Sequence, residues 1–225
     1  MKKLNIATLL CGLILFITSC GGSTTATSVD EVETTAKLVA EGEVAIGSQV
    51  WTSKNLDVTK YRNGDVIPEV QDKKVWGKLT TGAWCYNENK TGKGSTYGKL
   101  YNWYAVNDPR GLAPKGYHIP SDAEWTILIP ETILGDEVST KMKSTSGWDD
   151  DGNGTNESGF AGLPSGSRDI NGDFSFVGAY GLWWCSSEDG ASHAWARFFY
   201  GSSGNVNRNF RFPKQYGLSV RCLRD

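Results

Sequence analysis

Aromatic residues and glycines are abundant in this chain, whereas long apolar runs are scarce between about Val44 and Asp225. The sequence holds nine Trp, nine Tyr, eight Phe and 27 Gly among its 225 residues. This mix suits short elements and loops around packed rings better than it suits long amphipathic helices. We therefore expect one loop-rich domain with little helix and an aromatic core.

Turn signals divide this region into short strands. Asn63-Gly64 and Asn171-Gly172 predict hairpins because both residue types tolerate positive φ. The segment "GLWWCSSE" predicts a strand whose Trp183 and Trp184 point to opposite faces. "HAWARFFY" and "VNRNFRF" predict two strands around a Gly/Ser loop. The closing "GLSVRCLRD" alternates and should place three side chains on one face: Leu218, Val220 and Cys222.

Short helices are the only helices that the sequence predicts. "GYHIPSDAEW" (Gly116 to Trp125) places a histidine and two carboxylates within seven positions, which raises the possibility of a catalytic trio. However, Ser121 and Glu124 form the S-x-x-E pattern of a capping box, with Asp122 in the first turn and His118 on the incoming strand. We favour the structural interpretation. Two further short helices are predicted around Leu100, Trp103 and Tyr104, and around Val138 and Met142.

The first twenty residues predict an exported lipoprotein. Lys2 and Lys3 precede "LLCGLILFI", which is too short to span a bilayer as a helix of about 20 residues but suits the core of a signal peptide. The next residues, "ITSC", resemble the bacterial lipoprotein box, in which Cys20 is acylated; the alternative is an ordinary secretory signal with a chance cysteine. We expect a signal peptide (1–19), lipidated Cys20 with a flexible tether (20–41) and a domain (42–225). The protein would then be an outer-membrane lipoprotein of the cell envelope, either periplasmic or surface-exposed.

Seven ordered segments carry a family resemblance. They are "IGSQVWTSKNLDVTKYRNGD", "LTTGAWCYNE", "YGKLYNWYAV", "GYHIPSDAEW", "NESGFAGLPSGSR", "GLWWCSSE" and "YGLSVRCLRD". Together they resemble the Fibrobacter succinogenes major paralogous domain, a family without an established molecular function. More distantly, "GYHIPSDAEW" and "YGLSVR" are similar to segments of the formylglycine-generating sulfatase-modifying family. That resemblance implies an α+β, C-type lectin-like fold: a small twisted antiparallel sheet, two or three short helices and long loops.

The same resemblance argues against an enzyme. Formylglycine-generating enzymes use a pair of cysteines late in the domain as a redox and copper site. The matching stretch, Trp195 to Arg221, contains no cysteine. No nucleophile elbow, phosphate loop or H-E-x-x-H motif appears either. We therefore expect a protein that is not an enzyme and needs no cofactor.

The cysteines of the domain suggest one disulfide. An exported compartment is oxidising, and Cys185 and Cys222 both lie in predicted strands of the C-terminal region, so we expect these two to pair. Relatives often carry a cysteine just before P-x-G-[WY]-H, where this chain has Ala113, so the partner that the family would offer Cys222 is missing. Cys85 is then expected to be a single buried thiol.

The segment "DDDGNG" is a candidate calcium site. Asp149, Asp151 and Asn153, followed by Gly154, match the opening of a calcium loop, whose oxygens converge on one hard cation. The position of the bidentate glutamate is occupied by Phe160, so an EF-hand is excluded. The alternative is a solvated turn rich in Asp and Asn.

A non-catalytic binding or adhesion module is the function that the sequence favours, with a glycan or a partner protein as ligand. The best candidates for an exposed binding face surround the last hairpin loop: Tyr200, Asn205, Asn207, Arg208 and Arg211. A formal net charge of −2 and the lack of a basic stripe exclude nucleic acid as an expected partner. The alternatives are a degenerate relative of the sulfatase-modifying enzymes and a purely structural surface lipoprotein. The sequence does not predict an oligomeric state.

Overall fold

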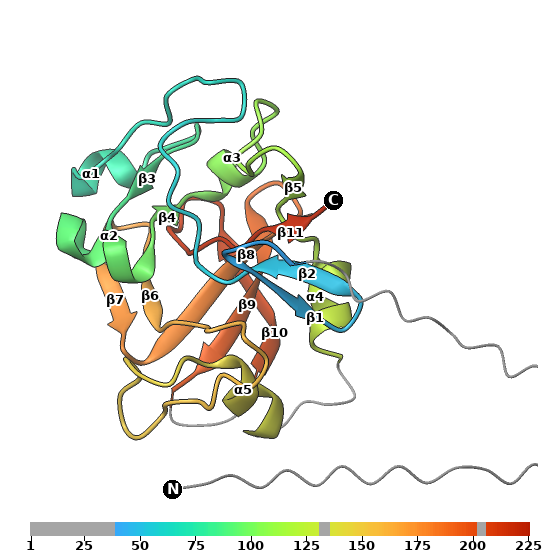
Figure 1. Ribbon diagram of the computed structural model, residues 1–225. Coiled ribbons are helices and arrows are strands. Elements are labelled where there is room, and N and C mark those ends of the chain that lie inside the picture. Colours follow the sequence, from blue (N-terminus) through green and yellow to red (C-terminus); the bar gives the residue numbers. More distant parts are fainter. Residues whose placement is uncertain (1–38, 131–135, 202–205) are drawn as a thin grey trace, which may run out of the picture. The chain divides into compact units, whose positions relative to one another are not determined.

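The computed structural model describes residues 39–130, 136–201 and 206–225, with the backbone alone for residues 136 and 206–210. Small antiparallel sheets and helices of at most seven residues make up this part of the chain, an α+β arrangement as predicted (Figure 1). The predicted signal peptide, Cys20 and most of the tether lie outside the described residues.

Two sheets form the centre of the domain. One has the strand order β1-β2-β11-β5, and the other has the order β10-β9-β8. Two-stranded pairs, β3-β4 and β6-β7, flank them. The strands are β1 (Glu43–Ile46), β2 (Gln49–Thr52), β3 (Trp84–Cys85), β4 (Leu100–Tyr101), β5 (Tyr117–His118), β6 (Ser165–Arg168), β7 (Phe174–Val177), β8 (Tyr180–Asp189), β9 (His193–Tyr200), β10 (Val206–Pro213) and β11 (Leu223–Arg224).

The helices lie around these sheets (Figure 1). They are α1 (Lys73–Trp76), α2 (Thr91–Tyr97), α3 (Trp103–Val106), α4 (Asp122–Leu128), α5 (Asp136–Met142) and a short 3-10 turn, η1 (Asn87–Asn89). The helices predicted near residues 103 and 138 are present as α3 and α5. Leu100, however, belongs to β4 rather than to the first of them. Among the described residues, no helix has the length and apolar character needed to cross a membrane.

The predicted capping box begins α4. The Glu124 backbone N–H donates to Ser121 Oγ (3.2 Å), and Glu124 Oε2 accepts from the Ser121 backbone N–H (2.8 Å). Asp122 accepts from Arg197 Nη1 (2.6 Å) on β9, so the first-turn acid also ties the helix to the central sheet. Because Glu124 closes the cap and Asp122 pairs with Arg197, both carboxylates stabilise the fold.

Both Asn-Gly turns are present where the sequence predicts them. Gly64 has φ of +95° between two bridged segments, and Gly172 has φ of +78° between β6 and β7. These left-handed conformations are accessible to glycine at little cost. Local turn chemistry is therefore sufficient to place these two hairpins.

The β8 strand separates two aromatic clusters, as its alternation predicts. Trp183 lies in one cluster with Trp51, Trp125 and Phe160, whereas Trp184 lies in the other with Trp84, Trp103 and Phe198. In the first cluster, the ring centroids of Trp51 and Trp125 are 4.7 Å apart. The domain thus has an aromatic core on each face of its three-stranded sheet.

Residues 217–223, which we name the C-terminal strap, join all four sheets; the strap is the red segment that leads into β11 in Figure 1. Backbone hydrogen bonds connect the strap to β2, β4, β6 and β8, and Leu223 also pairs with His118 of β5. Leu218, Val220 and Cys222 all contribute to the cluster that contains Trp184, which confirms the predicted shared face. The strap is therefore the segment that connects the sheets of the domain to one another.

The predicted disulfide between Cys185 and Cys222 is absent. Both are free, buried thiols, and so is Cys85, as expected for that residue. Cys185 belongs to the Trp183 cluster and Cys222 to the Trp184 cluster. The two side chains therefore lie in different cores, which a disulfide cannot join without backbone movement. Burial raises the pKa of each of the three thiols to about 12, which keeps them protonated and unreactive.

Candidate functional site

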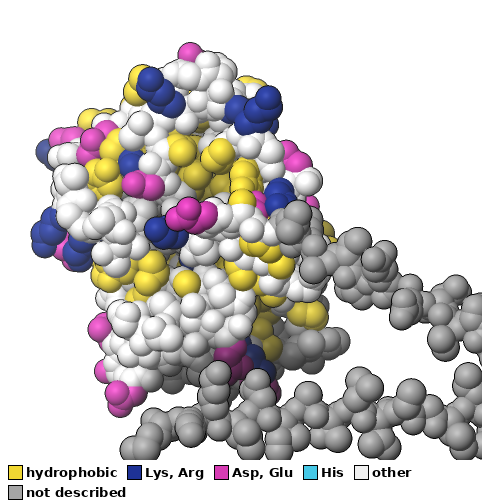
Figure 2. Space-filling view, in the orientation of Figure 1, with side chains coloured by type: hydrophobic (Ala, Val, Ile, Leu, Met, Phe, Trp, Pro, Cys, Tyr) yellow, Lys and Arg dark blue, Asp and Glu magenta, His cyan; other side chains and the backbone are white. Residues whose placement is uncertain are grey.

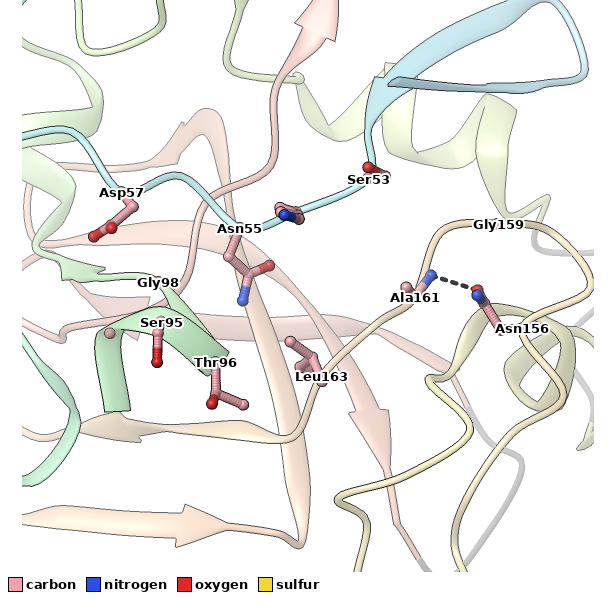
Figure 3. Close-up of a pocket in the computed structure, with 12 residues that line it drawn as sticks. Ser53, Asn55, Asp57, Ser95, Thr96, Gly98, Asn156, Gly159, Ala161 and Leu163 are labelled. Carbon is pink, nitrogen blue, oxygen red and sulfur yellow. Dashed lines mark hydrogen bonds between the residues drawn. The ribbon is translucent and has the colours of Figure 1, made fainter. Parts of the chain in front are cut away.

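A cavity of about 550 Å³ opens between the segment after β2, helix α2 and the loop before β6 (Figure 3). We name it the Asn55 pocket. Two other cavities in the described part of the chain are smaller, at about 320 and 230 Å³. The pocket is lined by Ser53, Lys54, Asn55, Asp57, Gly94, Ser95, Thr96, Gly98, Asn156, Gly159, Ala161 and Leu163.

The walls of this pocket are shaped by local backbone features. Gly98 ends α2 with φ of +72°, and a side chain there would meet the Leu56 carbonyl, so the helix and the β2 segment approach closely. On the opposite side, Asn156 adopts φ of +53° and its Oδ1 accepts from the Ala161 backbone N–H at 2.7 Å. That bond closes the loop and holds Ala161 at the pocket edge, while Asn55 lies between the two walls (Figure 3).

Asn55 is fixed by four hydrogen bonds. Its Oδ1 accepts from Trp183 Nε1 and from Arg221 Nε, each at 2.8 Å. Its Nδ2 donates to the Tyr97 carbonyl (2.9 Å) and to Ser219 Oγ (3.2 Å). Every polar site of the amide is therefore used, and the side chain joins α2, β8 and the strap at the floor of the pocket.

Arg221 lies behind this floor and is fully buried. Besides Asn55, it donates to the Thr52 carbonyl (2.7 Å) and the Ala161 carbonyl (3.0 Å), and its guanidinium lies 4.5 Å from the centre of the Phe160 ring. Among the described residues, no carboxylate pairs with it. Burial lowers its pKa to about 9, because a low-dielectric interior disfavours the charged form. Arg221 thus remains mostly protonated at neutral pH.

The remaining charges of the pocket differ in their pairing. Asp57 is paired with Lys99, whose buried ammonium also lies over the rings of Trp84 (4.6 Å) and Tyr86 (4.7 Å). Lys54 is exposed and has no ion-pair partner in the described part of the chain. The rest of the lining consists of hydroxyl groups, amides, glycines and two apolar side chains. The pocket is therefore equipped to form hydrogen bonds, and among the described residues no histidine or cysteine lines it.

His118 lines the second cavity, of about 320 Å³, together with Glu124. Its Nε2 lies 2.9 Å from Glu124 Oε1 and its Nδ1 lies 2.8 Å from Asp225 Oδ1. Both ring nitrogens are therefore engaged by carboxylates, and the ring links the start of α4 to the end of the chain. The sequence predicts the cap correctly, but it does not reveal Asp225 as the second partner of His118.

We expect this contact to weaken as the pH rises. Burial opposes protonation of His118, but hydrogen bonds and charges from Asp225 and Glu124 outweigh it, so the pKa lies above the ordinary value of 6.5. A raised pKa gives stability that is complete below about pH 6.5 and is lost as the pH rises through the folded-state value. The ring is partly exposed and screened by water, so the loss should be about 0.5 kcal/mol. Urea unfolding at pH 5.5 and 8.5 measures it, and His118→Gln should remove this part of the pH dependence. Identical pH dependences in both proteins would contradict the assignment.

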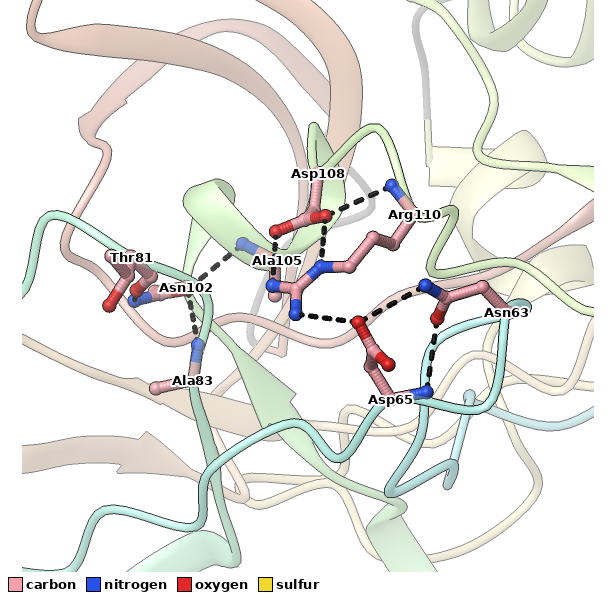
Figure 4. A network of polar contacts seen from close by, with 8 residues as sticks. All are labelled: Asn63, Asp65, Thr81, Ala83, Asn102, Ala105, Asp108 and Arg110. Atoms are coloured by element: carbon pink, nitrogen blue, oxygen red, sulfur yellow. Dashed lines mark hydrogen bonds and ion pairs between the residues drawn. The ribbon is translucent and has the colours of Figure 1, made fainter.

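A network of charged side chains borders the third cavity, of about 230 Å³ (Figure 4). Arg110 binds both carboxylate oxygens of Asp108 at 2.8 Å and contacts Asp65 at 3.2 Å. Hydrogen bonds lower the pKa of both acids, chiefly from Arg110 for Asp108 and from Asn63 for Asp65. Arg110 also lies 4.1 Å from the centre of the Tyr61 ring. Because these groups satisfy one another, we interpret the network as a clamp between two loops.

The predicted calcium segment forms a turn. Asn153 Oδ1 accepts from the Trp148 backbone N–H (3.0 Å), while Asp149 and Asp151 are exposed. Among the described residues, no three side chains from His, Cys, Asp or Glu gather closely enough to hold a metal ion. Phe160, in the position of the missing glutamate, is buried in the core. Calcium binding by this turn stays a prediction.

Two members of the predicted binding face around the last hairpin have described side chains, Tyr200 and Arg211, and these two do not share a surface. Tyr200 packs against Phe198 and Tyr180, with ring centroids 4.3 and 5.6 Å apart. Arg211 pairs in register with Trp195, lies over its ring and contacts Asp189. Successive side chains along a strand point to opposite faces, and Trp195 and Tyr200 are an odd number of residues apart on β9, so they point to opposite faces. Arg211 lies beside Trp195, and Tyr200 and Arg211 therefore lie on opposite faces of the sheet. Asn205 and the side chains of Asn207 and Arg208 lie outside the described residues.

Sequence reasoning missed the residues of the Asn55 pocket because their types are ordinary in turns. They come from three distant segments, residues 53–57, 94–98 and 156–163. The available signal was indirect: most of these positions fall in segments that carry the family resemblance.

One family model matches nearly all of the described domain. Its description is Fibrobacter succinogenes major domain, and it matches residues 44–224. No curated protein and no solved structure gives a significant match.

Proposed function

This chain belongs to the Fibrobacter succinogenes major domain family, and from this premise and the geometry above we propose a non-catalytic, glycan-binding module that uses the Asn55 pocket. The module would be carried by an envelope lipoprotein anchored through acylated Cys20. A C-type lectin-like arrangement of the domain is part of the proposal. The capped helix α4, the small antiparallel sheets and the long loops support it by analogy.

The polar lining of the Asn55 pocket is the observation that carries this proposal. Ligand pockets commonly enclose about 300–1,000 Å³ and contain a few well-placed polar groups. This pocket, of about 550 Å³, offers hydroxyl groups from Ser53, Ser95 and Thr96 and an amide from Asn156. A sugar ring presents matching donors and acceptors around an apolar body, which Leu163 and Ala161 can contact. The set contains no nucleophile paired with a base, so it favours binding over catalysis.

A glycan array tests the proposal. The purified full chain in detergent is applied to a panel of neutral and acidic bacterial and host glycans, with and without calcium. Binding to a defined set of glycans supports the proposal, and a blank array contradicts it. The calcium arm tests the turn at Asp149, Asp151 and Asn153, because only a calcium-dependent ligand would be lost on chelation.

Thr96→Trp should strongly weaken glycan binding while leaving the fold intact. Thr96 is exposed on α2 and lines the pocket, so a large ring at this position fills the space without disturbing the core. The matched control is Thr91→Trp, at the exposed start of the same helix and away from the lining. We expect at least about a tenfold loss of affinity for Thr96→Trp, corresponding to about 1.4 kcal/mol, and no change for Thr91→Trp. Equal affinities for both variants would place the ligand elsewhere.

A further inference from the structure

We propose that the Asn55 pocket selects acidic sugars, whose carboxylate or sulfate ester compensates the buried charge of Arg221. This inference rests on the proposed function, since it names the class of glycan that the same pocket takes. Its basis is an excess of positive charge around an otherwise neutral, hydrogen-bonding cavity.

Arg221 is placed to act through the pocket wall. Two of its three hydrogen-bond acceptors, Asn55 and Ala161, line the pocket, and the third, Thr52, directly precedes the lining residue Ser53. The guanidinium is therefore one residue layer away from a bound ligand. In a poorly solvated environment, the attraction between this charge and an anion is screened far less than in bulk water.

The other two fully buried arginines show why Arg221 is distinctive. Arg197 is neutralised by Asp122 at 2.6 Å. Arg168, like Arg221, donates to carbonyl groups, those of Val70, Gln71 and Gly172, but none of these residues lines one of the three cavities described above. Among the residues that the structure describes, Arg221 is therefore the fully buried arginine that has no carboxylate partner and also lies beside a pocket. An unpaired buried charge is costly, so a ligand that supplies the opposite charge gains from it.

The charged residues at the rim of the pocket also favour an anionic ligand. Lys54 lines the pocket and has no carboxylate partner in the described residues. The acid in the lining, Asp57, is already paired with Lys99. Glu157, next to Asn156, is not part of the lining, and it lies 3.9 Å from Lys141, which also pairs with Glu137 at 2.7 Å. Lys54 and Arg221 therefore leave the pocket with more positive than negative charge.

A paired set of probes tests this inference. Isothermal titration of the full chain in detergent would compare uronic-acid, sulfated and neutral forms of the same oligosaccharide. We expect the acidic forms to bind about tenfold more tightly than the neutral form at low salt, and this preference to shrink as ionic strength rises. Lys54→Gln should weaken the binding of acidic ligands about threefold more than it weakens the binding of the neutral form. Lys74→Gln, an exposed lysine on α1 away from the pocket, is the control.

The outcomes separate this inference from the proposed function. Neutral glycans that bind as tightly as acidic ones would overturn the charge preference and leave glycan binding intact. A blank array and no heat with any probe would overturn both. A preference for acidic sugars that survives Thr96→Trp would place the anion site outside the pocket and overturn the inference. Uronic acids bound in preference to sulfated sugars, or the reverse, would support it and identify the anion.

Discussion

Deletion of residues 217–225 is expected to leave the domain unable to fold. The deletion removes the C-terminal strap, whose backbone bonds join β2, β4, β6 and β8. It also removes Leu218, Val220, Cys222 and Leu223 from the core, all at most 5% exposed. Burying one such side chain contributes about 1.5–3 kcal/mol, so the combined loss is comparable with the whole stability of a typical domain, about 5–15 kcal/mol.

Circular dichroism and proton NMR measure this outcome. The truncated chain should show no cooperative unfolding transition and no dispersed amide signals. Deletion of Asp225 alone is the matched control, because it removes the contact with His118 and the bond to the Gly116 carbonyl but leaves the strap in place. A cooperatively folded protein ending at residue 216 would show that the sheets assemble without the strap.

Asn55→Ala should destabilise the domain by about 3 kcal/mol. The substitution leaves Trp183 Nε1, Arg221 Nε, Ser219 Oγ and the Tyr97 carbonyl without the partner that Asn55 provides. Each buried polar group left unsatisfied costs about 1–3 kcal/mol. Water from the adjoining pocket can replace part of the lost bonding, which keeps the expected loss below the sum of the individual costs.

Urea unfolding of Asn55→Ala beside Lys54→Ala tests this prediction. Lys54 is the neighbouring residue and also lines the pocket, but it is exposed, so its removal should change stability by no more than about 0.5 kcal/mol. Equal stabilities of the two variants would show that Asn55 does not organise the pocket floor.

Some of the residues that stabilise the core also form the pocket. Asn55 forms part of the pocket lining and also binds the strap through Ser219 and Arg221. The residues that close the fold therefore also fix the floor of the pocket. We expect a rigid, preformed site, which lowers the entropic cost of binding.

Local signals in the sequence predicted the local structure well. The capping box at Ser121 and Glu124 and the two Asn-Gly turns depend on residues close together in the chain. The alternation of Trp183 and Trp184 depends only on the pleat of one strand. In each case, neighbouring residues contain all the information that the structure uses.

Long-range relations were harder to predict. Cys185 follows Trp184 and so points to the opposite core from Cys222, although both residues lie in or beside strands. The predicted binding face included Tyr200 and Arg211, but the alternation of side chains along the strands places these two residues on opposite faces of one sheet. The Asn55 pocket depends on three segments that meet only after folding, and no residue type in it signals a site.

An NMR titration tests the central claim most directly. Backbone amide signals of the isotope-labelled full chain in detergent are followed while an oligosaccharide identified on the array is added. We predict that the shifted signals cluster at residues 53–57, 94–98 and 156–163, and that Thr96→Trp removes these shifts. Shifts confined to other surfaces, such as β9 and β10, would contradict a ligand site in the Asn55 pocket.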